Sequence, residues 1–348
     1  MNSSKRTELS EIGEFGLIER LKGYLPAKSD KIIKSIGDDA AVIKNSDDSV
    51  QLISTDLLME GVHFDLAYTP LKHLGYKSIA VNVSDIAAMY GTPSHVVVGL
   101  ALSNRFSVEA IEELYAGMKL ACDAYSIDLV GGDTTSSRSG LGISVTVVGT
   151  STVDDVVYRS GAQLNDLICV TGDLGAAFMG LQVLEREKQV YLANPDMQPE
   201  LLDKDYIVER QLKPEARMDV VKSLKSLGLK PTSMIDISDG LASELMHICK
   251  ESNVGAYIYE EKLPIDPMTF DTAREFELDP LTIMLNGGED YEVLFTIPQS
   301  DYEKVRNHPD ISVIGYVKSA DEGVNIYTKG EHLVPVTAQG WNHFKGSK

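Results

Sequence analysis

The segment SMIDISDGLASEL, residues 233–245, passes from an apolar strand into a helix through one short polar turn. Residues 233–237 predict a strand, and Ser238-Asp239-Gly240 precedes a helix that we expect over residues 241–251. Asp236 and Asp239 therefore lie at a strand-to-helix junction. Strands and helices that alternate in this way predict a mixed α/β class.

Similar periodic segments extend along the chain on both sides of this junction. Further strands are expected at residues 50–54, 95–103, 127–130, 141–150, 167–171, 255–259, 291–297 and 311–317. Further helices are expected at residues 71–90, 107–125, 176–187 and 214–227, the last with Pro214 at its start. We expect Thr55-Asp56 to end the first of these strands. The segment 127–130 should be a short buried strand that ends in the polar motif Gly131–Thr135.

Length, charge and cysteine content limit the possible function classes. With 348 residues, of which 43% are hydrophobic, the chain fits two domains, which we place at residues 1–149 and 150–348. A net charge of −20 argues against nucleic-acid and anionic-membrane partners, because both kinds of binding depend on Lys and Arg. No targeting segment or long apolar run is present, so we expect a cytoplasmic protein. The cysteines, Cys122, Cys169 and Cys249, form no metal-binding pattern and should be buried thiols.

Acidic residues recur beside apolar segments. The motifs are Gly37-Asp38-Asp39, Ser54-Thr55-Asp56, Ser84-Asp85, Gly132-Asp133-Thr134, Asp236-Ile237-Ser238-Asp239-Gly240 and Gly288-Glu289-Asp290. A single aspartate at a strand end is usually a turn former or a helix cap. If several converge, each pair would repel by on the order of 1 to 4 kcal/mol, so such a cluster needs cations. Carboxylate oxygens select hard ions, and Mg²⁺ combines carboxylates with phosphate oxygens, so the set indicates a magnesium-nucleotide site.

The motifs of the commonest nucleotide kinases are missing from the sequence. There is no GxxxxGK[ST] phosphate loop, no HRD catalytic loop and no DFG motif. A serine hydrolase is also disfavoured, because no GxSxG elbow occurs and His63 has no obvious nucleophile beside it. A different phosphoryl-transfer machinery is therefore required.

The ordered set of motifs resembles the thiamine-monophosphate kinase family, part of a wider group with aminoimidazole ribonucleotide synthetase and selenophosphate synthetase. The residues that carry the resemblance are Gly13–Ile18, Gly37–Ala41, Ser54–Asp56, Gly61–Phe64, Val81–Met89, Gly131–Thr135, Arg159–Gly161, Asp236–Leu241, Gly287–Glu292 and Gly340-Trp341. They span nearly the whole chain. The resemblance implies ATP-dependent phosphorylation of thiamine monophosphate to thiamine diphosphate by in-line transfer, assisted by several Mg²⁺ ions.

The resemblance also implies a fold and roles for particular residues. The fold would be a two-domain, synthetase-like α/β fold of the α+β type, with N-terminal domains that pair into a mixed barrel across a homodimer and ATP near the dimer cleft. Metal ligands would be Asp39, Ser54, Thr55, Asp56, Asp85, Asp133, Asp236 and Asp239, of which Asp56, Asp85 and Asp239 would be catalytic. ATP would contact Gly132, Asp133, Arg159, Ser238 and Tyr115. The substrate side would comprise His63, Glu289 and Trp341, whose ring suits the cationic thiamine rings.

Alternatives stay open from the sequence alone. A selenophosphate synthetase would show a reactive Cys near its N-terminus, whereas Cys122 is the first cysteine here. The string Gly287–Glu292 is more typical of the thiamine enzyme than of aminoimidazole ribonucleotide synthetase. A non-catalytic module that binds metal or nucleotide would keep the same acidic residues. If these residues have structural roles only, Arg159 would pair with a surface acid, His63 would be a core histidine and Trp341 would cover the core.

Overall fold

Residues 7–338 are described by the computed structural model of the chain, and within them the strands form two sheets. The first contains β1 (Ile32–Lys34), β2 (Ala41–Lys44), β3 (Ser49–Met59), β4 (Thr92–Leu102), β5 (Asp128–Ser136) and β6 (Gly142–Thr152). The second contains β7 (Leu167–Thr171), β8 (Ser233–Asp236), β9 (Val254–Tyr259), β10 (Val293–Ile297), β11 (Ile311–Ser319), β12 (Val324–Tyr327) and β13 (Leu333–Pro335). Their orders are β1-β2-β3-β6-β4-β5 and β13-β12-β9-β11-β7-β10-β8. Both sheets are mixed, because β4 pairs parallel with β5 and β9 pairs parallel with β12.

The helices pack around and between these sheets. The first half of the chain forms α1 (Leu9–Lys22), α2 (Leu71–Ala88) and α3 (Val108–Tyr125). The second half forms α4 (Ala176–Ala193), α5 (Asp205–Leu212), α6 (Met218–Ser226), α7 (Leu241–Ser252), α8 (Pro267–Glu275), α9 (Pro280–Asn286) and α10 (Tyr302–Val305). One-turn 3-10 helices cover Glu260–Lys262, Gln299–Asp301 and Ala320–Glu322. In the described part of the chain, no helix is both long and apolar enough to cross a membrane.

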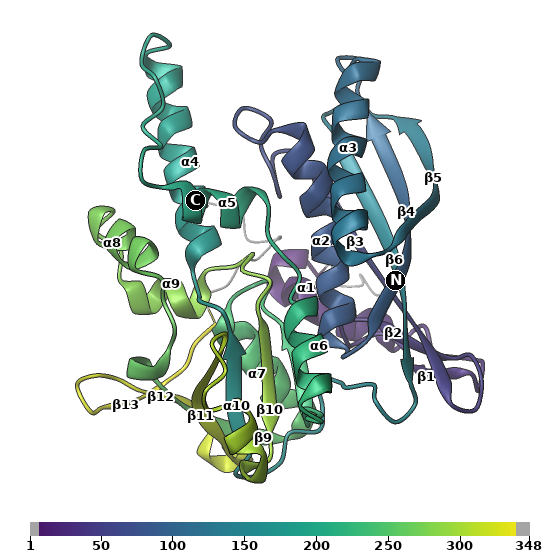
Figure 1. Ribbon diagram of the computed structural model, residues 1–348, viewed down its shortest axis with the longest axis vertical. Coiled ribbons are helices and arrows are strands. Elements are labelled where there is room, and N and C mark those ends of the chain that lie inside the picture. Colours follow the sequence, from purple (N-terminus) through teal and green to yellow (C-terminus); the bar gives the residue numbers. More distant parts are fainter. Residues whose placement is uncertain (1–6, 339–348) are drawn as a thin grey trace, which may run out of the picture.

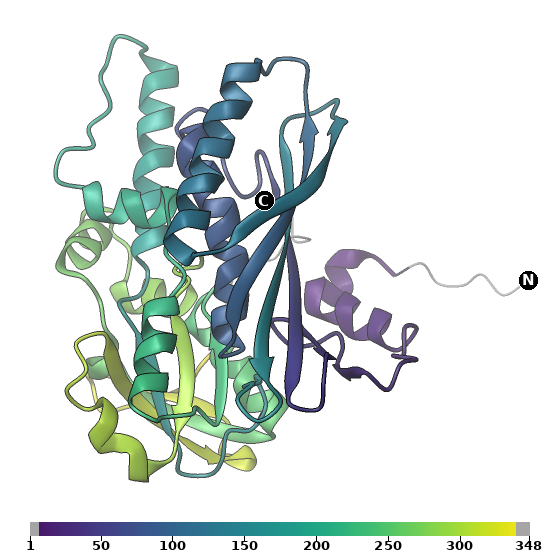
Figure 2. The same ribbon diagram turned by 45° about the vertical axis from the view of Figure 1, so that its right-hand side comes forward.

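Helix α2 connects the two halves of the molecule. It contacts β3 and β6 of the first sheet, β8 of the second and α3 along its length, and Figure 1 shows it between the two sheets. Its side chains are buried on nearly every face, which agrees with its apolar sequence. Figure 2 shows α2 and α3 on one face of the first sheet and α1 beyond the opposite face. Residues at the end of α2 can therefore meet residues from both sheets.

The sequence-based elements agree with the structure in most places. Strand β7 has the predicted bounds, Ser107 caps α3 by accepting the Ala110 N–H, and the three cysteines are buried. The first sheet ends at Thr152 and the second begins at Leu167, so the chain changes sheet within residues 153–166. The division into residues 1–149 and 150–348 stays a prediction.

Three local expectations were wrong. Thr55-Asp56 does not end its strand, because β3 pairs with β6 without interruption from Ser49 to Met59. The segment predicted as a short buried strand belongs to β5, an exposed strand at the sheet edge that contains the Gly131–Thr135 motif instead of preceding it. The helix expected from Pro214 begins only at Met218, and helix α5 before it was not predicted.

Candidate active site

Three aspartates from separate elements meet between the two sheets. Asp39 precedes β2, Asp85 lies in the last turn of α2 and Asp236 ends β8. One carboxylate oxygen from each of them lies within 4.8 Å of the other two. The predicted convergence of acidic motifs is therefore present for these three residues, which we call the carboxylate cluster.

Hydrogen bonds orient the three carboxylates. The Ser54 hydroxyl donates to Asp85 Oδ2 at 2.5 Å, and the Ser84 hydroxyl donates to Asp236 Oδ2 at 2.6 Å. The Arg159 guanidinium donates to Asp39 Oδ1 from Nε at 3.1 Å and from Nη2 at 2.5 Å. Asp39 Oδ2 is buried and accepts no hydrogen bond. A buried carboxylate oxygen without a donor is costly to keep and is suited to an ion.

Burial and mutual repulsion raise the pKa values of Asp85 and Asp236. Burial, followed by the charge of Asp39, raises the pKa of Asp236 to about 7. Burial also raises the pKa of Asp85 well above its ordinary value, with the nearby carboxylates Asp56, Asp236 and Asp39 adding to the shift. The pKa of Asp56 is raised by burial to about 6. These carboxylates therefore need protons or cations beside them.

The composition of the cluster fits a hard divalent cation such as Mg²⁺. Its three ligand atoms are all carboxylate oxygens, the ligand type that Mg²⁺ prefers. Asp39, Asp85 and Asp236 come from three different elements, so they could hold an ion from different directions. The unpartnered Asp39 Oδ2 supports the same fit.

A large cavity surrounds the carboxylate cluster. Its volume is about 1490 Å³, which exceeds the roughly 300–1,000 Å³ of a typical single-ligand pocket. The walls come from α1, β1, β2, β3 and the end of α2 on one side, and from α4, α7, Gly288, Glu289 and Tyr291 on the other. The predicted site residues that line it are Asp39, Ser54, Thr55, Asp56, His63, Asp85, Arg159, Asp236, Ser238, Asp239 and Glu289. A cavity of this size and origin can hold two ligands between the halves of the chain.

Several of these lining residues already have partners within the protein. His63 Nδ1 accepts the Met59 N–H at 3.0 Å, and the Thr55 hydroxyl donates to the Val145 carbonyl at 3.0 Å. The Glu289 carboxylate pairs with the buried Lys77 amine at 3.0 Å and accepts the Gln211 amide at 2.7 Å. Glu289 is therefore held from both halves, because Lys77 belongs to α2 and Gln211 to α5.

Other predicted site residues lie away from this cavity. Gly132 and Asp133 are exposed on the edge strand β5, and neither lines it. Tyr115 of α3 lines a separate cavity of about 380 Å³ together with Phe106 and Ile111. Trp341 lies outside residues 7–338 and is not described. The structure thus brings together the aspartates of the cluster but not the Gly132-Asp133 motif.

The structure also adds residues that sequence reasoning missed. Glu244 of α7 is buried beside the Asp239 turn, and its Oε1 accepts the Asp239 N–H at 2.8 Å. Burial and the charge of Asp239 raise the pKa of Glu244 well above its ordinary range. Phe178 and Gln182 of α4 line the cavity. Lys77 directly precedes the apolar part of α2, which was an available signal for it, whereas the short α5 gave none for Gln211.

The fold and this site define the class of protein. Residues 37–151 match the family described as AIR synthase related protein, N-terminal domain, and residues 163–327 match the corresponding C-terminal domain. The chain is therefore a two-domain protein of the AIR synthase related class.

Relatives that match over most of the chain identify the family within this class. The thiamine-monophosphate kinase of Aquifex aeolicus (strain VF5) is 36% identical over 336 residues, covering 97% of this chain and 99% of the relative. The same enzyme of Bacillus subtilis (strain 168) is 35% identical, covering 89% of this chain and 93% of the relative. A solved structure of AaThiL complexed with AMPPCP and TMP has a TM-score of 0.83 and 35% identity, covering 98% of this chain and all of that one. The chain belongs to the thiamine-monophosphate kinase family, as its motifs predicted.

Proposed function

We propose that the protein transfers the γ-phosphoryl group of ATP to thiamine monophosphate, forming thiamine diphosphate and ADP. The observation that carries the proposal is the carboxylate cluster facing a cavity large enough for two ligands. The similarity to AaThiL, solved with AMPPCP and TMP, supports a nucleotide and thiamine monophosphate as those ligands. Curated relatives that match over most of the chain bear the name of the same activity.

The acceptor needs little activation by the protein. A phosphate monoester has its second pKa near about 6, so its oxygens are mostly anionic at about pH 7 and no strong general base is required. The difficulty is to bring two anions together in line. The work of the site is therefore positioning and charge compensation.

Asp39, Asp85 and Asp236 are proposed to hold Mg²⁺, with Asp56 and Asp239 in the same cavity as further ligands for several ions. Ser54, Thr55 and Asp133 complete the proposed ligand set. Bound Mg²⁺ would supply positive charge that offsets the repulsion between the phosphates and stabilises the equatorial oxygens of the transferred group.

Polar and charged side chains of the chain are proposed to bind the two substrates. The Arg159 guanidinium lines the cavity, and its planar fork matches phosphate oxygens. Ser238, Gly132, Asp133 and Tyr115 are the other proposed ATP contacts. His63, Glu289 and Trp341 are proposed on the thiamine monophosphate side.

A homodimer is proposed from the free face of the first sheet. Leu57 and Val97 lie on the face opposite α2 and α3, and their exposed fractions are 58% and 39%. Val130 of the edge strand β5 is 59% exposed. Exposed apolar residues on a sheet face and an unpaired edge favour pairing with a second copy, which would form the mixed barrel. In that arrangement Gly132 and Asp133 would lie close to the interface instead of in open solvent.

The proposal is tested by ADP release in the presence of ATP and Mg²⁺, with thiamine monophosphate, thiamine or no acceptor, and with products identified by mass. Thiamine diphosphate should form from the monophosphate alone. ADP release that no acceptor stimulates would leave the cation and nucleotide site in place. It would assign the chain to another ATP-dependent synthetase of the class, or to a non-catalytic binding module.

A further inference from the structure

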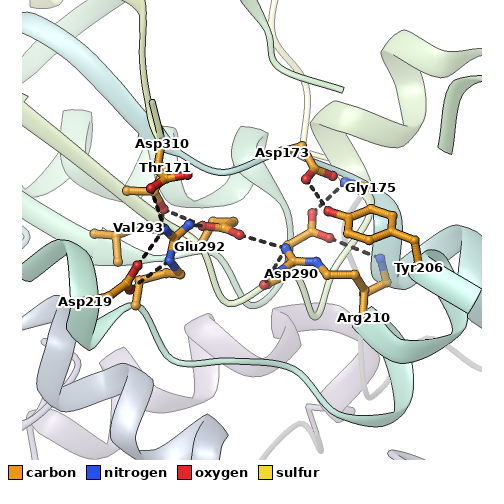
Figure 3. A network of polar contacts seen from close by, with 12 residues as sticks. Thr171, Asp173, Gly175, Tyr206, Arg210, Asp219, Asp290, Glu292, Val293 and Asp310 are labelled. Carbon is orange, nitrogen blue, oxygen red and sulfur yellow. Dashed lines mark hydrogen bonds and ion pairs between the residues drawn. The ribbon is translucent and has the colours of Figure 1, made fainter. Parts of the chain in front are cut away.

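The turn at residues 289–292 presents alternate side chains to opposite sides. Glu289 and Tyr291 line the large cavity. Asp290 and Glu292, which are 1% and 2% exposed, contact instead the start of α4 and two arginines. Figure 3 shows the contacts of Asp290 with Gly175 and of Glu292 with Arg210. The same four residues therefore form part of the site and the layer that supports it.

The backbone of this turn is strained and tied to the carboxylate cluster. Glu289 and Tyr291 have φ angles of 66° and 53°, in the left-handed region that favours glycine. Such a backbone conformation is strained and persists only where the surroundings of the residue hold it. The Glu289 N–H donates to the Ser238 carbonyl at 2.7 Å, and the Tyr291 N–H donates to the Ile237 carbonyl at 2.8 Å. A shift of the turn would therefore also disturb the segment after Asp236.

Glu292 is fixed by three side chains. Its Oε2 accepts the Thr171 hydroxyl at 2.5 Å and Arg217 Nη1 at 2.6 Å, and its Oε1 pairs with Arg210 Nη2 at 2.9 Å. A Cβ atom at Gly172 would lie 2.3 Å from Glu292 Oε1, so the carboxylate also packs directly on the backbone. Loss of this charge would leave two largely buried guanidinium groups without their shared partner.

Arg210 extends the network to the turn and to α5. Its Nη2 donates to the Asp290 carbonyl at 3.1 Å, and the next residue, Gln211, donates to the Glu289 carboxylate at 2.7 Å. The Asp290 carboxylate accepts the Gly175 N–H at 2.7 Å, which anchors the start of α4 (Figure 3). The network thus connects α4, α5 and the turn as one unit.

We propose that Glu292 is a positioning residue which, with Arg210 and Arg217, holds Glu289 in the orientation needed to bind the phosphate acceptor. The proposal rests on the proposed function, in which Glu289 lies on the acceptor side. Glu292 itself faces away from the cavity, so it acts through Glu289 and Tyr291 and does not touch substrate.

A double-mutant cycle tests this assignment with Glu292→Gln, Glu289→Gln and the combined variant, assayed for thiamine diphosphate formation. Glu292→Gln should raise KM for thiamine monophosphate by about 10- to 100-fold, the range for residues that orient a ligand group, with a smaller change in kcat. In the Glu289→Gln background the same substitution should have little further effect, because the residue through which it acts is already altered. If the two substitutions raise KM by factors that multiply in the combined variant, the proposal is overturned.

Glu275→Gln is a control for the loss of a bridging carboxylate, at a position that is 44% exposed. Glu275 of α8 also bridges two cations, Arg186 at 2.7 Å and Lys204 at 2.6 Å, away from the turn. The KM of the Glu275→Gln variant for thiamine monophosphate should equal that of the wild type. An equal rise in KM for Glu275→Gln and Glu292→Gln would overturn the positioning role. If Glu292→Gln does not fold, Arg210→Lys takes its place in the cycle, because it keeps the charge and loses the fork.

The outcomes for the proposed function and for the positioning role are separable. A wild-type protein that forms no thiamine diphosphate contradicts the proposed function before any variant is compared. An active wild type with independent effects of Glu289→Gln and Glu292→Gln contradicts the positioning role alone.

Discussion

The carboxylate cluster lowers the stability of the folded protein and is suited to bind a cation. Asp39, Asp85 and Asp236 are held close together although burial and like charge raise the pKa values of Asp85 and Asp236. Their orienting hydrogen bonds come from Ser54, Ser84 and Arg159 and do not supply a full counter-charge to all three. Residues that destabilise the folded protein in this way are expected at functional positions.

Asp85→Asn should separate the effect of this carboxylate on cation binding from its effect on folding stability. Turnover should fall by about 100-fold or more, because the variant lacks a charged ligand. The Tm in the presence of a chelator should be unchanged or higher, because a repelling buried charge is removed and the amide oxygen can still accept the Ser54 hydroxyl. The exposed Asp47→Asn is the control and should change neither property. Normal turnover of Asp85→Asn would exclude Asp85 as a ligand.

His247 predicts a specific dependence of stability on pH. Burial, aided by the charges of Arg159 and Lys250, lowers its pKa to about 4 from an ordinary 6.5. Between these values the unfolded chain binds the proton more readily than the folded one, so stability falls as the pH decreases from 6.5 to 4. Relative to His247→Gln, the wild type should lose up to about 3 kcal/mol between pH 7 and pH 4 in denaturant titrations. A stability difference that does not change with pH would contradict this assignment.

At the scale of elements, the close crossing of α2 and α3 fixes the helix that carries Asp85. A Cβ at Gly75 would lie 2.0 Å from the Leu114 carbonyl oxygen, and one at Gly117 would lie 1.9 Å from that of Lys72. Backbone atoms cannot rotate out of the way as a side chain can. Gly75→Ala should therefore lower the free energy of unfolding by about 1–3 kcal/mol or more and reduce turnover by displacing α2.

Gly99→Ala is the control for this crossing. Its Cβ would be 3.7 Å from the nearest atom, an ordinary contact, so its stability should stay close to that of the wild type. Denaturant unfolding of the two variants under one condition measures the difference. Equal stability of Gly75→Ala and wild type would mean that the helices tolerate a wider separation.

The elements also show which parts of the fold the sequence could predict. Strand β7 and helix α3 were found because an apolar run and a capped periodic segment each have one plausible structure. The segment at residues 127–130 was read as buried because an apolar run alone does not distinguish a central strand from an edge strand. Helix α5 is short and polar, and Pro214 suggested too early a start for α6, so the network of Arg210 and Arg217 could not be predicted.

The candidate site was also predictable only in part, because the sequence does not show which distant residues meet. The motifs predicted a metal-binding role for Asp39, Asp85 and Asp236, but only the fold determines that they meet while Asp133 lies on an exposed edge. The partners of Glu289 come from α2 and α5, and no local pattern connects them. Contacts between distant elements are therefore the part that sequence reasoning missed.

For the whole molecule, the exposed apolar face and edge of the first sheet predict a homodimer. Leu57→Glu with Val130→Lys places charges on its exposed face and edge strand. The variant should sediment as a monomer where the wild type sediments as a dimer, because the apolar contact that favours association is lost. Val108→Lys, at an exposed apolar position of α3 on the other face, is the control and should stay dimeric. A monomeric wild type would contradict the proposed barrel.

We propose that the two halves of the molecule bring ATP and thiamine monophosphate together for direct transfer. The most direct measurement is a single-turnover reaction with ATP that carries a heavy-oxygen label in its γ-phosphoryl group, followed by mass analysis of the thiamine product. We predict that the label appears in the terminal phosphoryl group of thiamine diphosphate at the rate of ADP formation. Label recovered only in inorganic phosphate, with no labelled thiamine diphosphate, would contradict direct transfer between the two substrates.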